Sequence, residues 1–218
     1  MNLLLTNDDG IDSVGFRALY DALSSVADVT AVAPAEDKSA VGRQMSADVL
    51  VEEHPLGYAI HGTPADCTVV GLESLCPDVD MVVAGCNKGA NLGAYVLGRS
   101  GTVSAAVEAA FFDVPAIAVS LYVPGGDAPW EELATAVEDV RPATDAATYL
   151  VEHASEAGVF EEAEYLNVNA PLDATEDAEM RITEPSTLYD MTARPDGDDR
   201  ITLHDGVWER MREGDLPD

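Results

Sequence analysis

The sequence has little positive charge. Of its 218 residues, 11 are Lys or Arg and 41 are Asp or Glu, which gives a formal net charge of -30 at pH 7. A chain this negative repels nucleic-acid polymers and anionic membrane surfaces, so both are excluded as partners. Hydrophobic residues still make up 47% of the chain. The composition therefore predicts a globular protein of a halophilic host, where molar salt screens the self-repulsion of a carboxylate-coated surface.

Cysteine is scarce, and long apolar runs are missing. The three cysteines include no Cys-x-x-Cys pair, which argues against a disulfide framework or a zinc knuckle and favours buried thiols in a reducing compartment. The apolar stretch 109–123 is interrupted by Asp113 and Pro115 and is too short to cross a bilayer. The N-terminal residues lack the pattern of a signal peptide. We expect a soluble, cytoplasmic protein.

Several catalytic signatures are also absent. The chain has no Cys-x5-Arg motif and no Gly-x-Ser-x-Gly elbow. Its histidines form no His-x-x-x-His pair, which weakens any interpretation as a zinc hydrolase. The glycine-rich segment 85–93 has the spacing Gly-x-x-x-Gly-x-x-x-Gly, which matches neither the dinucleotide-binding fingerprint nor a Walker A loop.

Apolar runs alternate with helical periodicity through residue 121. This alternation predicts an α/β fold with a doubly wound, mostly parallel sheet and helices on both faces. The expected strands are 3–5, 29–33, 80–84, 115–121 and 166–169, and the expected helices are 14–25, 64 onward and 100–112. Further expectations are a hairpin at 47–61, a long helix at 130–157 that Pro142 could break, and short strands at 181–184 and 200–203.

Polar side chains follow three of the predicted strands. Asp8 and Asp9 end the first strand, Ser39 lies in the loop after the second, and Asn87 and Asn91 follow the third. Ligands of an open α/β sheet bind at the carboxyl ends of its strands, so these loops can converge. Two adjacent carboxylates repel each other, and a divalent cation relieves that repulsion. The alternative is a simple Asn-Asp-Asp-Gly turn that caps the next helix.

A candidate anion site lies at the start of the helix predicted at 100–112. Ser100, Gly101 and Thr102 offer backbone N–H groups and two hydroxyls there, although the same residues could serve only as a helix cap. Asn87 and Asn91 offer amide oxygens to a cation and amide hydrogens to an anion. Ligands that are all oxygen favour Mg²⁺ or Mn²⁺. The residues alone thus predict a metal- and phosphate-binding α/β protein.

Five motifs occur together in a fixed order: residues 7–10, 33–39, 62–67, 85–93 and 100–103. Taken together they resemble the SurE family, the survival-protein nucleotidases. The resemblance covers residues 1–121, and residues 166–171 resemble the Asn-x-Asn-x-Pro strand end of that family. Residues 40–44 and Arg99 depart from the family pattern.

The resemblance implies a metal-dependent phosphomonoesterase that hydrolyses nucleoside 5′- and 3′-monophosphates with a metal-activated water. One Mg²⁺ or Mn²⁺ per subunit would bind Asp8, Asp9, Ser39 and Asn87, and Asp8 and Asp9 would be catalytic. The substrate phosphate would contact Asn91, Ser100, Gly101 and Thr102. Two alternatives to a phosphomonoesterase are a non-catalytic nucleotide-binding sensor and a nucleotide-sugar transferase.

The resemblance also implies the domain organisation. A Rossmann-like core would span residues 1–125 and carry the site. Residues 126–218 would complete the sheet and contribute to a homodimer or homotetramer.

Overall fold

A seven-stranded sheet forms the centre of the computed structural model, which describes residues 1–76, 78–123, 132–175, 177–197 and 199–213. The strand order is β3-β4-β2-β1-β5-β6-β7. All neighbours are parallel except β3 and β4, which form an antiparallel hairpin. The strands are β1 (Asn2–Thr6), β2 (Asp28–Pro34), β3 (Leu50–His54), β4 (Gly57–His61), β5 (Met81–Lys88), β6 (Ala116–Tyr122) and β7 (Tyr165–Pro171).

The order of the strands reverses at β1, which lies between β2 and β5. The chain therefore builds the sheet outward from β1, first to one side and then to the other. In open α/β sheets, such a switch point leaves a crevice at the carboxyl ends of the strands, where ligands bind. Residues that follow β1, β2 and β5 directly are consequently the ones that border this crevice.

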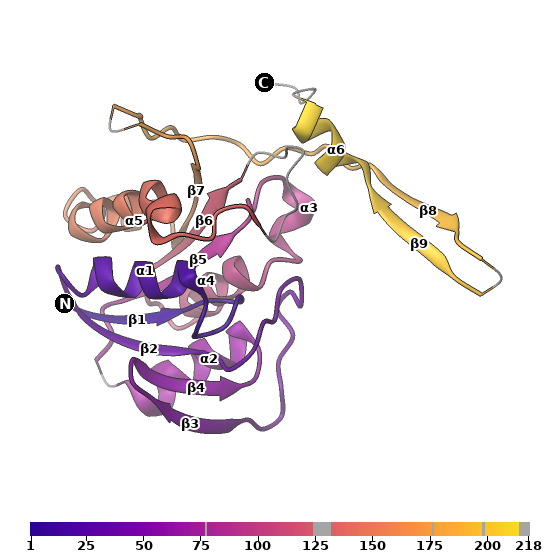
Figure 1. The fold of residues 1–218 in the computed structure, drawn as a ribbon. Helices are drawn as coiled ribbons and strands as arrows, with labels where there is room; N and C mark the ends of the chain where they lie inside the picture. The colour runs from indigo at the N-terminus through magenta and orange to yellow at the C-terminus, as the bar shows by residue number, and fades with distance from the viewer. Residues whose placement is uncertain (77, 124–131, 176, 198, 214–218) are drawn as a thin grey trace.

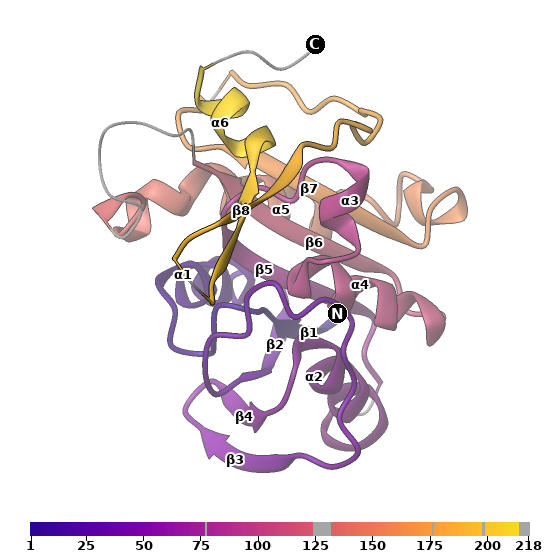
Figure 2. The ribbon, with the colours of Figure 1, turned by 90° about the vertical axis from the view of Figure 1, so that its right-hand side faces the viewer.

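Helices cover both faces of the sheet (Figures 1 and 2). On one face α1 (Val14–Leu23) packs against α5 (Arg141–His153), and on the other α2 (Pro64–Val70) packs against α4 (Gly101–Phe111). A π-helical turn, Gly71–Leu75, continues α2, and a 3-10 turn, Val137–Val140, precedes α5. A second 3-10 turn, Val159–Glu161, leads to β7. Within the described residues, no helix has the length and apolar character needed to cross a membrane.

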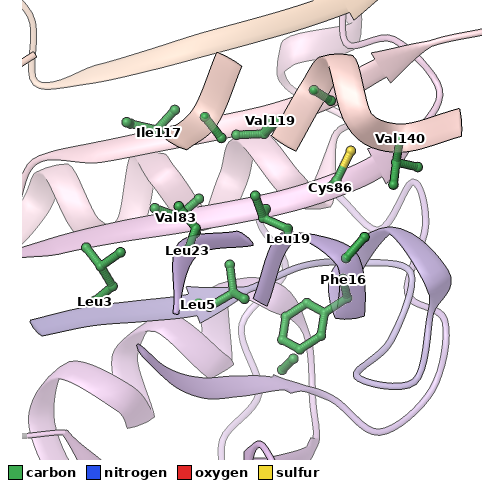
Figure 3. Packing of buried hydrophobic residues seen from close by; sticks show 14 of the residues in the cluster. Leu3, Leu5, Phe16, Leu19, Leu23, Val83, Cys86, Ile117, Val119 and Val140 are labelled. Atoms are coloured by element: carbon green, nitrogen blue, oxygen red, sulfur yellow. The ribbon is translucent and has the colours of Figure 1, made fainter. Parts of the chain in front are cut away.

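Successive side chains of a strand point to opposite faces of the sheet. Because helices cover both faces, both sets of side chains in the central strands are buried. Leu3 and Leu5 join a core with α1 and α5, whereas Leu4 between them joins the core under α2 and α4. Figure 3 shows the first core, in which Phe16 and Leu19 of α1 lie over the sheet. This double burial explains why the strands appear in the sequence as continuous apolar runs.

The C-terminal part ends in an arm that projects away from the sheet (Figure 1). It consists of the antiparallel strands β8 (Met191–Pro195) and β9 (Ile201–Asp205), followed by α6 (Gly206–Glu213). The base of the arm rests on the short helix α3 (Ala94–Leu97), where the Ala94 N–H donates to the Ser186 carbonyl at 2.8 Å. The Tyr95 hydroxyl donates to Asp205 Oδ2, also at 2.8 Å.

The predicted parallel α/β sheet, the hairpin within 47–61 and the strand near 200–203 are confirmed. The predicted strand at 181–184 is wrong: that segment is irregular and Ile182 is fully exposed, because no neighbouring strand pairs with it. Pro142 lies in the first turn of α5 rather than breaking a longer helix, since a missing N–H costs nothing there. Residues 130 and 131 of the predicted helix lie outside the described residues, as does the expected boundary between residues 125 and 126.

A capping box starts α2 and ties it to the preceding loop. Thr63 Oγ1 accepts from the Asp66 N–H at 3.2 Å, and Asp66 Oδ2 accepts from the Thr63 N–H at 2.8 Å. The Ser46 N–H and hydroxyl also donate to Asp66, at 2.8 and 2.7 Å. Burial opposes ionisation of Asp66, but the hydrogen bonds from Ser46 and Thr63 outweigh it and lower the pKa of this carboxyl.

We predict that Asp66→Asn destabilises the protein at pH 7 by about 1–2 kcal/mol, because the amide cannot accept all of these hydrogen bonds. The folded-state pKa of Asp66 lies below the unfolded value. The advantage of the wild type is therefore present above about pH 4 and disappears as the pH falls through the lower folded-state pKa. Denaturant titrations in molar KCl at several pH values would measure it. The exposed Glu152 supplies a control, Glu152→Gln, and a pH-independent deficit for Asp66→Asn would contradict the prediction.

Candidate active site

The loops that follow β1, β2 and β5 meet at the carboxyl edge of the sheet. The Lys38 N–H, in the loop after β2, donates to the Asp8 carbonyl at 2.7 Å. The Lys88 N–H, at the end of β5, donates to Asp9 Oδ2 at 3.0 Å. A cavity of about 340 Å³ opens between these loops, and Asp9, Ser39 and Lys88 contribute to its lining. The loops therefore converge as the sequence predicts.

Asp8 is held against the N-terminus of α4. Its side chain is buried, with 3% of the residue exposed. Oδ1 accepts from the Thr102 hydroxyl at 2.6 Å, and Oδ2 accepts from the Thr102 N–H at 3.2 Å. Burial raises the pKa of Asp8, while the bonds from Thr102 oppose that rise. The positive end of the helix dipole also favours the charged carboxylate at this position.

Gly101 is required for this close approach. A Cβ at position 101 would lie 2.7 Å from the Asp8 Cβ and 2.9 Å from Asp8 Oδ2. Ser100 serves as the N-cap of α4, since its Oγ accepts from the Val103 N–H at 3.1 Å. The segment 100–102 thus fixes both the helix and the Asp8 carboxylate. Its contact with a phosphate stays a prediction.

Asp9 faces the cavity and carries the more accessible carboxylate of the pair. Burial, and next the neighbouring charge of Asp8, raise the pKa of Asp9 to about 7, against the lowering effect of the Lys88 N–H. Such a pair binds protons readily when nothing else balances its charge. A divalent cation between the carboxylates would supply that balance.

Ser39 lies beside an acid that the sequence analysis did not select. The Ser39 N–H donates to Asp37 Oδ1 at 2.7 Å, and both residues line the cavity. The charge of Asp37 adds to the pKa elevation of Asp8 and Asp9. Asp37 lies in the loop after the strand β2, a position like the one that identified Asp8. In a chain with 41 Asp and Glu residues, however, one more acid in a loop does not stand out.

Asn87 belongs to a polar row that crosses three strands. It is aligned with Ser120 in the β5–β6 pairing, and Ser120 is aligned with Asn169 in the β6–β7 pairing. Asn91 is 5% exposed, and its side-chain nitrogen donates to Ser120 Oγ at 2.8 Å. The hydrogen bonds of Asn91 therefore go to β6 and β7, and Ser120 connects Asn91 to the row that contains Asn87.

Three further polar residues of this edge, Ser120, Asn167 and Asn169, were not selected as site residues, although the last two belong to the Asn-x-Asn-x-Pro strand end noted in the sequence. The signal that could have found them is weak. Asn167 and Asn169 alternate with apolar residues in β7, the edge strand that pairs with the buried β6, so both side chains point to the same face. One polar side chain on such a face is common, whereas two in succession call for a shared partner.

The donor set fits a hard cation. No group of three or more His, Cys, Asp or Glu side chains is arranged to hold a metal ion in the part of the chain that the structure describes. Asp8, Asp9, Ser39 and Asn87 instead offer two carboxylates, one hydroxyl and one amide oxygen. The Asn87 side-chain nitrogen donates to the Gly89 carbonyl, which leaves the amide oxygen for a cation. All-oxygen sites of this kind suit Mg²⁺ or Mn²⁺, which complete their shell with water.

Fold and site together define an α/β protein with a carboxylate pair, one buried and one half-buried, at the switch point of its sheet, beside a helix N-terminus. The comparison with known families gives the class a name. The family model described as "Survival protein SurE" matches residues 3–190, so this chain belongs to the SurE family.

Relatives and a solved structure agree with this assignment. The chain is 64% identical over 219 residues to the 5′-nucleotidase SurE of Haloquadratum walsbyi, covering 100% of this chain and 83% of that protein. It is 63% identical over 217 residues to the 5′-nucleotidase SurE of Haloarcula marismortui, covering 99% and 80%. The crystal structure of the SurE protein from Aquifex aeolicus superposes with a TM-score of 0.73 at 28% identity, covering 94% of this chain and 82% of that one.

We predict that Gly101→Ala lowers Mn²⁺ affinity by at least about tenfold, or about 1.4 kcal/mol, because the added methyl group must displace the Asp8 carboxylate. Gly98→Ala is the matched control: a Cβ at Gly98, three residues away, has no heavy atom within 4 Å. Titration calorimetry of both variants with Mn²⁺ measures the difference. Equal affinities would show that Asp8 is not a ligand or that the helix start yields freely.

Proposed function

We propose that this protein is a metal-dependent phosphomonoesterase that converts nucleoside 5′-monophosphates, and also 3′-monophosphates, to nucleoside and phosphate. The 64% and 63% identical relatives carry the name 5′-nucleotidase, which supports the substrate class. The observation that carries the chemistry is the pair of buried Asp8 and half-buried Asp9, with Asp8 bonded to the start of α4.

One Mg²⁺ or Mn²⁺ ion per subunit would be held by Asp8, Asp9, Ser39 and Asn87. When bound, the ion acts as a Lewis acid toward the phosphoryl oxygens and the attacking water. Thr102 fixes the orientation of the Asp8 carboxylate through two hydrogen bonds. The Lys88 N–H fixes one oxygen of Asp9, so both carboxylates are positioned before the substrate arrives.

Asp9 is the better placed of the two acids to orient the attacking water. It lines the cavity, whereas both oxygens of Asp8 are engaged by Thr102. A carboxylate that accepts a hydrogen bond from water directs the oxygen lone pair toward phosphorus and can take up the proton at Oδ1 or Oδ2. We therefore assign the positioning of the ion to Asp8 and the orientation of the water to Asp9.

The phosphate group would be bound by Asn91 and by the segment Ser100, Gly101 and Thr102. The Thr102 N–H and hydroxyl already bind Asp8, and the Ser100 N–H binds the Val96 carbonyl. The second hydrogen of the Asn91 side-chain amide and the Gly101 N–H would therefore be the donors that stabilise charge on the non-bridging oxygens as it develops. A protein of net charge -30 needs local positive potential to attract this anion. The bound ion, the start of α4 and Lys88 in the cavity lining supply it. Arg43 Nε lies 3.1 Å from Glu108 Oε1, so the charge of this arginine is already balanced by a carboxylate.

We also propose that the protein assembles as a homodimer or homotetramer in the cytoplasm. The arm supports the assembly: Ile201 and Leu203 of β9 are 69% and 71% exposed, and an isolated two-stranded hairpin is marginally stable in water. Burial of the arm against a second copy would cover these side chains. Three cysteines that are buried and free are in keeping with a reducing compartment.

We predict that Asp8→Asn abolishes phosphatase activity, with a loss of at least about a hundredfold, or about 2.7 kcal/mol of transition-state stabilisation. The amide removes one of the two charges that hold the ion. Phosphate release would be assayed with Mn²⁺ or Mg²⁺ in molar KCl, with a chelator as a blank and circular dichroism to verify the fold.

Asp12→Asn is the control for this substitution, because Asp12 lies four residues away with its side chain 71% exposed. It should retain wild-type turnover. Full turnover by Asp8→Asn would remove the assignment of the ion site. Binding of a nucleoside monophosphate by the wild type without phosphate release would favour a sensor protein instead.

We predict that kcat/KM on nucleoside monophosphates exceeds that on sugar phosphates by at least about tenfold, because the base and ribose add binding energy that a sugar phosphate lacks. A panel of 5′- and 3′-nucleotides, sugar phosphates and a small aryl phosphate would measure this ratio. Equal rates across the panel would limit the proposal to a general phosphatase.

A further inference from the structure

Asn167 and Asn169 of β7 form hydrogen bonds with the backbone N–H and carbonyl of Asn91. The Asn91 N–H donates to Asn169 Oδ1 at 2.7 Å. The Asn91 carbonyl accepts from Asn167 Nδ2 at 2.9 Å and from Asn169 Nδ2 at 3.4 Å. We propose that this amide clamp, defined as Asn167 and Asn169, consists of positioning residues that hold the phosphate-binding loop of the nucleotidase proposed above. The inference rests on that proposed function.

The clamp lies at the right place in the sheet for such a role. Asn169 is aligned with Ser120, and Ser120 with Asn87, so the clamp belongs to the row that leads to the candidate ion site. Ser120 Oγ accepts one hydrogen of the Asn91 side-chain amide at 2.8 Å. The backbone of Asn91 and the orientation of its amide are thus fixed by two neighbouring strands, β6 and β7.

The side-chain amide of Asn167 lowers the stability of the fold, because one of its polar atoms is buried without a partner. Its Oδ1 is buried and has no hydrogen-bond partner among the described residues. An unsatisfied buried oxygen destabilises a fold, and an apolar residue of similar size would avoid the penalty. What the amide provides in return is the hydrogen bond to the Asn91 carbonyl, which an apolar residue cannot donate. A role in holding the loop accounts for this choice of side chain.

A loop that is ordered before the substrate arrives does not lose its conformational entropy during binding. It also keeps the Asn91 amide within the narrow range of positions that stabilises the transferring phosphoryl group. Loss of the clamp should therefore weaken the binding of phosphate-bearing ligands more than it weakens binding of the metal ion, whose candidate ligands are three side chains on other loops and Asn87.

The two clamp residues differ in what they must provide. Position 169 must offer an acceptor to the Asn91 N–H, whereas position 167 must offer a donor to the Asn91 carbonyl. The same substitution, Asn to Asp, keeps the acceptor at 169 and loses there only the longer donation at 3.4 Å, whereas at 167 it removes the donor at 2.9 Å. Both changes add one negative charge to the same strand, two residues apart, so the comparison controls for charge.

The experiment compares Asn167→Asp, Asn169→Asp, Asn169→Leu and Val168→Ala in the full chain with Mn²⁺ in molar KCl. The measurements are KM and kcat on a nucleoside monophosphate, the inhibition constant of inorganic phosphate, and the thermal midpoint. Val168 packs partly buried against the apolar core, so Val168→Ala should lower the midpoint and leave KM unchanged.

We expect Asn167→Asp and Asn169→Leu to raise KM and the phosphate inhibition constant by about tenfold or more. Asn169→Asp should recover most of the affinity that Asn169→Leu loses. Equal effects of Asn167→Asp and Asn169→Asp would overturn the clamp, as would a lower midpoint in the Asn variants with unchanged KM. If the wild type itself releases no phosphate, the proposed function fails. Calorimetry with inorganic phosphate then tests the clamp: Asn167→Asp and Asn169→Leu should bind phosphate more weakly than Asn169→Asp does.

Discussion

The burial of the Asp8 carboxylate at the start of α4 is the constraint on which the rest of the site depends. Removing a carboxylate from water is unfavourable unless protein groups replace its hydration, and Thr102 replaces it with two hydrogen bonds. This contact fixes the distance between β1 and α4, and it permits only glycine at position 101. The second carboxylate, Asp9, then lies beside a charge that cannot move away. Burial first, and then the charge of Asp8, raises the pKa of Asp9 to about 7, and a divalent ion would balance the charge of the pair.

Much of the fold could be predicted because its signals are local. The strand that ends at Thr6, the helix that starts at Pro64 and the helix start at Ser100 each depend on neighbouring residues, and each is found where it was expected. In the C-terminal arm, by contrast, the strand near 200–203 was predicted but its partner β8 was not. Its strands β8 and β9 pair only with each other, so burial imposes no alternation on their sequence. The segment 181–184 was also predicted as a strand, but no strand among the described residues pairs with it.

The candidate site shows the same division. Asp8, Asp9, Ser39 and Asn87 could be selected because each follows a predicted strand. The amide clamp could not, since the hydrogen bond from Asn91 to Asn169 joins residues 78 positions apart. Its geometry depends on the order of β5, β6 and β7, and on the register shift between Ala84 and Asn87 that aligns Asn87 with Ser120. Only the pairing of strands in space brings these side chains into one row.

The charge distribution explains how an acidic protein could bind an anion. Surface carboxylates remain hydrated, and molar salt reduces the range of their repulsion to about 3 Å, so they contribute little to the potential inside the crevice. The start of α4 and the Lys88 N–H lie within the fold, where mobile ions screen them much less. Salt therefore suppresses the unfavourable part of the field and spares the favourable part. High salt and the proposed phosphate binding would be compatible because the surface acids that repel the anion and the groups proposed to attract it occupy different dielectric environments.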